Sequence, residues 1–404
     1  MNLSVGLAEG QSVVEVELLG TFRDSVGRTY PPGRHVFASE VELRPDDANA
    51  TDTAFAVDGI TIGVGFHWER KERQVFRGGV RILQRKGLTV INDVSLEEYV
   101  VSVISSEMSA SCPLELLKAH AVISRSWLCY PKLRPESVGP GDFSFRRGDE
   151  IIRWYGRESH QDFDVCADDH CQRYQGITKA YSQAVTQAVR ATAGQMLEYD
   201  GQVCDARFSK CCGGVTEEYR AAWDDRDVLY LVSLPDTDAG GQVYCDTQDR
   251  ALLAGILPGF DQETQDFYRW TVRYSGEEIR ELVHARLGED TGVVTALAPL
   301  ERGPSGRIVR LRIEGELKSL VVGKELEIRR VLSRSHLYSS AFDVEHTGKD
   351  FVLHGKGWGH GVGLCQIGAA VMASRGKGYR EILSHYYPGT ELSRQDAKVS
   401  RLEM

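Results

Sequence analysis

One carboxylate stands at the end of an otherwise apolar helical stripe, where a charge is costly unless it is protonated or paired. Residues 95–130 predict two helices joined by a short Ser-rich turn. On the first helix, Leu96, Val100 and Val103 share a face with Glu107. An acid that keeps its proton near neutral pH is what a general-acid catalyst needs. Glu107 is therefore a candidate acid, and a carboxylate that reaches water or a core arginine is the alternative.

The second predicted helix runs from Pro113 to about Tyr130 and carries an arginine among apolar residues. Proline suits the first position of a helix. Because Arg125 lies in the middle of this helix, it needs a carboxylate partner. Glu107 is a candidate across the hairpin, although such a pair alone is more often structural than catalytic.

Two histidines and two cysteines fall within twelve positions, namely His160, Cys166, His170 and Cys171. Thiolate and imidazole are the ligands that zinc prefers, although the spacing is not that of a zinc finger. Buried thiols with two surface histidines are the alternative. Four ligands would close the site, whereas three would leave a position for water. We expect one structural zinc that holds residues 131–176, a long polar stretch with little periodicity.

Five glycines alternate in the segment HGKGWGHGVG, residues 354–363. This pattern predicts an extended segment with one bare face, which a sugar ring or another chain can approach closely. We expect Trp358 to stack on a sugar, His360 to donate a hydrogen bond to it, and Gly361 to line the approach. Tight strand packing is the alternative. The segment is not a phosphate loop, because Gly-Lys-Ser/Thr is missing.

A further glycine-containing turn, FSKCCGGVTE, occupies residues 208–217. A cysteine nucleophile is conceivable there. Adjacent Cys211 and Cys212 beside two glycines fit a tight turn better.

The composition is that of an ordinary folded protein. The chain has 404 residues, of which 42% are hydrophobic and 26% are charged, and a net charge of -10. The acidic balance and the lack of a long basic run argue against a general nucleic-acid partner. No run of 18 apolar residues indicates a membrane span, and the N-terminus does not read as a signal peptide. The nine cysteines are an odd and unevenly placed set, so we expect mostly thiols.

Strand and helix patterns mix along the chain without βαβ regularity. Alternating strands fill residues 1–94, and the helical hairpin follows. Later patterns predict a helix within 177–194, a hairpin turn at Asp200-Gly201, a helix near 277–288, strand pairs over 306–328, and a helix after the glycine segment. We expect an α+β fold of mixed small sheets with a catalytic helical hairpin and two lobes that flank a cleft. We expect residues 1–94 to form an N-terminal β-rich region and residues 95–404 a catalytic domain with insertions at about 131–176 and 215–300, with the N-terminal strands packed as part of the same domain.

Five ordered motifs resemble the stage II sporulation protein D family, which includes amidase enhancers. The motifs are LEEYV from Leu96 with Glu107-Met108, LKAHAVISRS from Leu117, Cys166 with HCQRYQG, Ser209 with GGVTE, and GWGHGVGLCQIGA from Gly357. One departure is Ser109, where the family commonly has proline.

The resemblance implies a peptidoglycan lytic transglycosylase that cleaves between N-acetylmuramic acid and N-acetylglucosamine. Glu107 would be the catalytic acid and base, Arg125 its support, and the His/Cys cluster a zinc site; no organic cofactor is expected. The matched substrate-binding positions are Ser209, Gly213, Gly214, Thr216, Trp358, His360, Gly361 and Gln366. Expected partners are peptidoglycan glycan strands and a cell-wall amidase, which places the protein in the cell envelope or periplasm.

Two other functions remain open. The first is a glycan-binding amidase enhancer without catalysis on the same fold. The second is a zinc hydrolase, which the absence of HExxH argues against.

Overall fold

The computed structural model describes most of the chain. The described residues are 1–47, 53–63, 69–109, 111–133, 144–155, 160–168, 171–179, 182–257, 267–348 and 350–394. Within them, helices and small mixed sheets alternate, which confirms the predicted α+β class.

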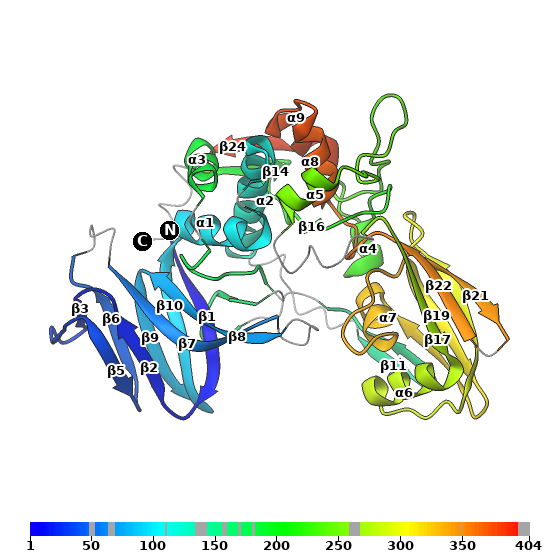
Figure 1. Ribbon diagram of the computed structural model, residues 1–404, viewed down its shortest axis with the longest axis horizontal. Coiled ribbons are helices and arrows are strands. Elements are labelled where there is room, and N and C mark those ends of the chain that lie inside the picture. Colours follow the sequence, from blue (N-terminus) through cyan, green and yellow to red (C-terminus); the bar gives the residue numbers. More distant parts are fainter. Residues whose placement is uncertain are drawn as a thin grey trace.

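Two sheets form the N-terminal body (Figure 1). The first contains, in spatial order, β13 (Val165–Cys166), β1 (Asn2–Gln11), β10 (Gly87–Ser95), β9 (Gly79–Arg85), β6 (Val41–Pro45), β3 (Phe22–Asp24) and β4 (Thr29–Tyr30). The second contains β5 (Gly33–Phe37), β2 (Val14–Leu18), β7 (Ala54–Ile62) and β8 (Arg70–Arg77). In β2 the apolar residues are buried and the glutamates between them are more exposed, as a half-buried strand requires. Phe22 of the first sheet packs on Phe55 of the second, so the two sheets share one core.

Helices occupy the centre of the molecule (Figure 1). They are α1 (Leu96–Glu107), α2 (Leu114–Leu133), α3 (Gln183–Ala191), α4 (Tyr219–Ala222), α5 (Arg250–Ile256), α8 (Gln366–Ser374) and α9 (Tyr379–Tyr386). Short strands accompany them, namely β14 (Gln195–Tyr199) with β15 (Gln202–Val203) and β24 (Glu391–Arg394), and β16 (Phe208–Ser209) with β23 (Leu364–Cys365). Ser95 caps α1 by accepting a hydrogen bond from the Glu98 N–H, which explains where the first predicted helix begins.

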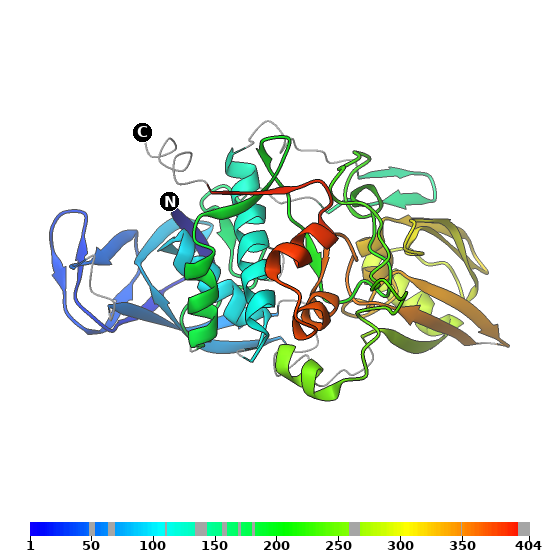
Figure 2. The same cartoon turned by 90° about the horizontal axis from the view of Figure 1, so that it is seen from above.

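A second β-rich body lies on the other side of these helices (Figures 1 and 2). One sheet contains β11 (Phe145–Arg147), β12 (Glu150–Ile152), β20 (Ser319–Gly323), β19 (Ile308–Gly315) and β18 (Val294–Arg302). The other contains β17 (Arg269–Ser275), β22 (Asp350–Lys356) and β21 (Phe342–Thr347), and helices α6 (Gly276–Leu287) and α7 (Glu325–Val331) pack on the body. Its core, from Trp270 to Leu353, is separate from the larger core that joins the N-terminal body to the central helices.

The long polar stretch 131–176 connects the two bodies. Its strands β11 and β12 join the second body, whereas β13 pairs with β1 in the first. These strands have only two or three residues each, which is too short to show a period in the sequence.

The sequence reading was wrong at the end of residues 306–328. We expected a strand over KELEI, but β20 ends at Gly323 and α7 begins at Glu325. Acidic residues in the first turn and arginines in the last turn favour the helix through its dipole.

The hairpin at Asp200-Gly201 is confirmed, with φ angles of 51° and 68°. None of the nine cysteines is in a disulfide. In the described part of the chain, no helix has the length and apolar character needed to span a membrane.

Candidate functional site

The helical hairpin places Glu107 at the last position of α1, where the apolar stripe ends. Leu96, Val100 and Val103 are buried, and Glu107 is half-buried. Its Oε1 accepts a hydrogen bond from the backbone N–H of Arg173 at 3.2 Å. The carboxyl group therefore has a fixed position at the edge of the core, where solvent is close.

Arg125 pairs with Glu97, at the opposite end of α1 from Glu107. The buried guanidinium donates to both carboxylate oxygens of Glu97, at 3.0 and 2.8 Å, and to the carbonyl of Gln195 at 2.9 Å. Ten helical positions between Glu97 and Glu107 correspond to about 15 Å along the axis. The suggested pairing of Arg125 with Glu107 is therefore wrong. Arg125 ties α2 to the start of α1.

Three of the four predicted metal ligands lie together. The ligand atoms of His160, Cys166 and Cys171 are within 4.8 Å of one another, and His160 Nε2 is 3.4 Å from Cys171 Sγ. All three side chains are half-buried. His170 lies outside the described residues. This donor set fits a soft divalent cation such as zinc.

The His160–Cys166–Cys171 cluster is connected to Glu107 through the backbone. Cys171 precedes Arg173 by two residues, and the Arg173 N–H binds Glu107. Further along, the Gln175 N–H donates to Ser102 Oγ of α1 at 3.2 Å. A metal that fixes Cys171 would also fix the segment that holds the carboxyl group.

The two glycine-rich segments lie side by side. Cys211 and Trp358 exchange two backbone hydrogen bonds, of 3.1 and 2.8 Å, and the Glu217 N–H donates to the Gly361 carbonyl at 2.9 Å. The fully buried Arg307 joins the segments, because its guanidinium donates to the carbonyls of Gly359 and Cys212, both at 3.1 Å. We call residues 209–217, residues 357–366 and Arg307 the glycine platform.

The glycines of this platform are not the bare face of a strand. Strand β22 ends at Lys356, and Gly357, Gly359, Gly361 and Gly363 all have positive φ, from 71° to 89°. A Cβ at Gly361 would lie 2.4 Å from the guanidinium carbon of Arg307. The glycines therefore permit close packing and left-handed backbone, which was the alternative reading, and the expected extended segment is wrong.

Most of the predicted sugar-binding residues are buried. The buried ones are Ser209, Gly213, Gly214, Thr216, Gly361 and Gln366. Thr216 Oγ1 donates to the Val232 carbonyl at 2.9 Å, and so acts within the fold. Trp358 and His360 are half-buried, and they are the two members of the set that reach the surface. Trp358 packs its ring against Phe267 and Tyr338.

His360 is held from both sides. Its Nδ1 accepts a hydrogen bond from the Val362 N–H at 3.0 Å. Burial, helped by the charges of Arg207, Arg307 and Arg329, moves the pKa of His360 well below its usual value, against an opposing hydrogen bond with the Phe208 backbone. A neutral imidazole is therefore expected, but its nitrogens act within the platform, and the expected hydrogen bond to sugar is not favoured.

A histidine that the sequence analysis did not single out connects the platform to α2. His120 is fully buried, and its Nε2 lies 3.0 Å from the Gln366 amide nitrogen. Burial lowers the pKa of His120 to about 3. Gln366 is thus a link between α2 and α8 rather than a surface residue.

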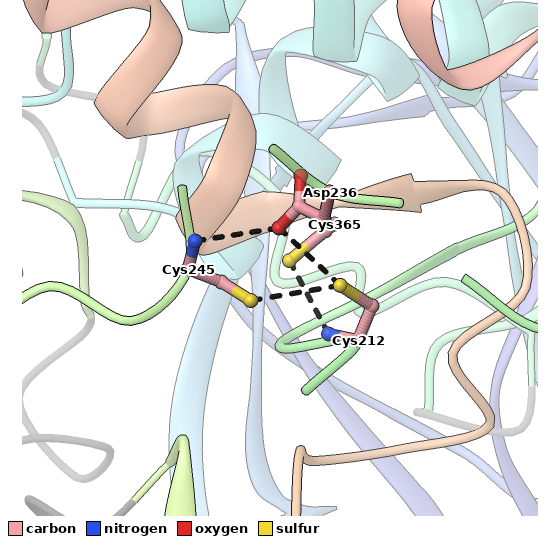
Figure 3. A group of neighbouring side chains, drawn as sticks. All are labelled: Cys212, Asp236, Cys245 and Cys365. Atoms are coloured by element: carbon pink, nitrogen blue, oxygen red, sulfur yellow. Dashed lines mark hydrogen bonds between the residues drawn. The ribbon is translucent and has the colours of Figure 1, made fainter. Parts of the chain in front are cut away.

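A second cluster was missed by the sequence analysis. Cys212 and Cys365 of the platform lie buried together with Asp236 and Cys245 (Figure 3). They are far apart along the chain and match no ligand spacing. The doublet Cys211-Cys212 was the one available signal, and it was interpreted as a tight turn.

Comparisons with known proteins agree with this architecture. The family model for stage II sporulation protein matches residues 84–199, which include the helical hairpin and the His160–Cys166–Cys171 cluster. A model described as a domain of unknown function (DUF8618) matches residues 217–363, which include the second core. Stage II sporulation protein D of Bacillus amyloliquefaciens is 26% identical over 77% of this chain and 78% of its own length. Its counterpart in Bacillus subtilis is 24% identical over the same shares. The amidase enhancer of Bacillus subtilis is 25% identical over 72% of this chain, but the match covers 40% of that relative.

The fold and the site therefore define an α+β protein related to sporulation and amidase-enhancing proteins. Residues 84–199 match the stage II sporulation protein family, and over about three quarters of its length the chain is similar to stage II sporulation protein D and to an amidase enhancer.

Proposed function

We propose that this chain is a peptidoglycan lytic transglycosylase with Glu107 as its acid and base. The observation that carries the proposal is the position of Glu107 at the end of a buried stripe. A backbone N–H holds the carboxyl group there, and the segment that supplies this N–H begins beside Cys171 of the His160–Cys166–Cys171 cluster. Positioning of this kind is what proton transfer to a bound sugar requires.

A single carboxyl group is sufficient for this reaction. Protonated Glu107 would donate its proton to the glycosidic oxygen as the bond between N-acetylmuramic acid and N-acetylglucosamine breaks. The carboxylate would then remove the proton from the 6-hydroxyl of the muramic sugar, whose oxygen closes the 1,6-anhydro ring. No second carboxylate nucleophile is needed, in contrast to retaining glycosidases.

The other predicted residues would act around this group. Arg125 would keep α1 and α2 in register through Glu97, and zinc at the His160–Cys166–Cys171 cluster would hold the Arg173 segment. Trp358 would offer an apolar surface to the glycan. Because the proposed substrate is peptidoglycan, the protein would act in the cell envelope or periplasm.

The test is incubation of the chain with intact peptidoglycan and with peptide-free glycan strands, followed by mass analysis for 1,6-anhydro ends. We expect cleavage of at least one substrate. Glu107→Gln keeps the shape but cannot donate the proton, so the rate should fall by about 10²- to 10⁴-fold. The matched control is Glu98→Gln, the same change at an exposed position of α1, which should cleave normally. A Glu107→Gln protein that cleaves at the wild-type rate would refute the assignment.

A glycan-binding amidase enhancer is the second candidate, because one relative is an amidase enhancer. It predicts no 1,6-anhydro product from either substrate and a faster reaction of a cell-wall amidase when the chain is added.

A further inference from the structure

Three thiols and a carboxylate from distant parts of the chain converge in the interior (Figure 3). Cys212 follows β16, Asp236 and Cys245 lie between α4 and α5, and Cys365 ends β23. Each of the four residues is at most 2% exposed. Their ligand atoms all lie within 4.8 Å of one another.

The spacing of these groups suits four ligands around one ion. Cys212 Sγ is 3.5 Å from Cys245 Sγ and 3.3 Å from Asp236 Oδ2. A tetrahedral zinc with Zn–S of about 2.3 Å and Zn–O of about 2.0–2.2 Å places its ligand atoms about 3.5–3.8 Å apart. These two distances are therefore within a few tenths of an ångström of that arrangement, and the other pairs of ligand atoms lie within 4.8 Å.

Outer hydrogen bonds already orient the ligand atoms. Cys365 Sγ accepts from the backbone N–H groups of Cys212 at 3.3 Å and Gly368 at 3.4 Å, the latter in the first turn of α8. The hydroxyl of Tyr386 donates to Asp236 Oδ1 at 2.6 Å, and the Cys245 N–H points to Oδ2 at 3.3 Å. Bonds of this kind fix ligands and stabilise the charge of a bound thiolate and carboxylate.

The buried carboxylate of Asp236 also needs positive charge. Among the described residues, its recorded ion-pair partner is His385, with Nε2 at 3.8 Å from Oδ1. A buried anion without a strong counter-charge is costly, and a divalent cation supplies that charge. Three sulfur ligands select a soft ion such as zinc over magnesium or calcium.

We propose that Cys212, Asp236, Cys245 and Cys365 bind a second zinc ion, separate from the His160–Cys166–Cys171 cluster. Because the protein supplies all four ligands, the site is structural. The ion joins the turn after β16, the segment between α4 and α5, and the start of α8. It therefore joins the two glycine-rich segments of the platform, which carry Cys212 and Cys365.

The test is the zinc content per chain of protein purified without chelator. The wild type should hold two zinc ions. Cys212→Ser/Cys245→Ser should hold one, and Cys166→Ser/Cys171→Ser should also hold one. Cys129→Ser, at a buried thiol of α2, is the matched control and should keep both ions. The zinc counts do not depend on glycan cleavage. The proposal of a second zinc site can therefore be supported or refuted independently of the proposed function.

Three results would overturn the second site. One is a wild-type chain whose zinc disappears completely in Cys166→Ser/Cys171→Ser. Another is a Cys212→Ser/Cys245→Ser chain that is folded and keeps the full wild-type count. The third is peptide mapping of unreduced protein that finds a disulfide among Cys212, Cys245 and Cys365. If the Cys212→Ser/Cys245→Ser chain does not fold, the metal retained by Cys166→Ser/Cys171→Ser decides: one ion supports the site, and none refutes it.

Discussion

Single residues of this protein are constrained mainly by what they pack against. Arg125 and Arg307 are fully buried, and each guanidinium connects segments that are distant in sequence. A buried guanidinium needs its acceptors, because an unpaired buried charge is strongly destabilising. The neighbours of these arginines are therefore expected to be sensitive to substitution.

Removal of the Glu97 carboxylate should destabilise the helical hairpin. Glu97→Ala leaves Arg125 with carbonyl partners but no counter-charge. Because the Glu97 side chain is 39% exposed, we expect a loss of about 2 kcal/mol in the free energy of unfolding, below the 3–5 kcal/mol of a fully buried pair. Urea unfolding measures it. The control Glu98→Ala should lose less than about 1 kcal/mol, and equal losses for the two variants would contradict the argument.

Substitution of Gly361 should lower the stability of the fold rather than weaken sugar binding alone. Gly361→Ala places a Cβ 2.4 Å from the guanidinium of Arg307 at a φ of 77°. The matched control is Gly288→Ala, at a φ of 71° with open space around the Cβ. We expect about 1 kcal/mol for Gly288→Ala and about 3 kcal/mol or more for Gly361→Ala. A Gly361→Ala chain with normal stability and weakened glycan binding would instead support the original prediction that Gly361 lines the approach of a sugar.

Helix α2 connects several elements of the described part of the chain. It pairs with the start of α1 through Arg125 and reaches α8 through His120 and Gln366. The turn before α2 is also held, because the Ser109 N–H donates to the Ile256 carbonyl of α5 at 3.2 Å. The position of Glu107 thus depends on several elements.

The contact between α2 and α8 should make stability depend on pH. The pKa of His120 is about 3 in the fold, against 6.5 in the unfolded chain. Between these values the unfolded chain binds a proton that the native chain does not, so stability is complete above pH 6.5 and falls as the pH falls. The slope due to His120 approaches about 1.4 kcal/mol per pH unit.

Urea unfolding between pH 4 and 6 measures this slope in wild type and in His120→Asn. The variant should show the smaller slope, whereas His284→Asn, at an exposed position of α6, should match the wild type. Equal slopes for wild type and His120→Asn would contradict the assignment.

At the scale of the whole molecule, the described residues form two hydrophobic cores. The larger one unites the N-terminal sheets with the central helices, and the smaller one fills the second β-rich body. The platform joins these cores, because its residues Cys212, Val362 and Cys365 belong to the larger core. Arg307, next to β19 of the second body, donates to the carbonyls of Gly359 and Cys212.

Two cores should give two thermal transitions in calorimetry. Leu117→Ala removes a fully buried side chain from the larger core, and Leu311→Ala removes one from the smaller. Each should cost about 2–5 kcal/mol. Each variant should therefore lower the midpoint temperature of one transition and leave the midpoint of the other unchanged. A single transition that both variants lower equally would show one cooperative unit.

Local patterns in the sequence were sufficient to predict the α+β class, the helical hairpin and the resemblance to the family. Caps and apolar periods act over a few residues, so α1, α2 and the turn at Asp200-Gly201 could be predicted. The cluster of His160, Cys166 and Cys171 could also be predicted, because these residues are near neighbours along the chain.

Only the tertiary structure decided which distant groups meet. It paired Arg125 with Glu97, placed Arg307 under Gly361, and gathered Cys212 and Cys365 from positions 153 residues apart. No local period encodes such contacts, because they arise when separate elements pack and buried polar groups must find partners. The same glycine pattern therefore fitted both a sugar-binding face and a closely packed platform, and the buried Arg307 favours the platform.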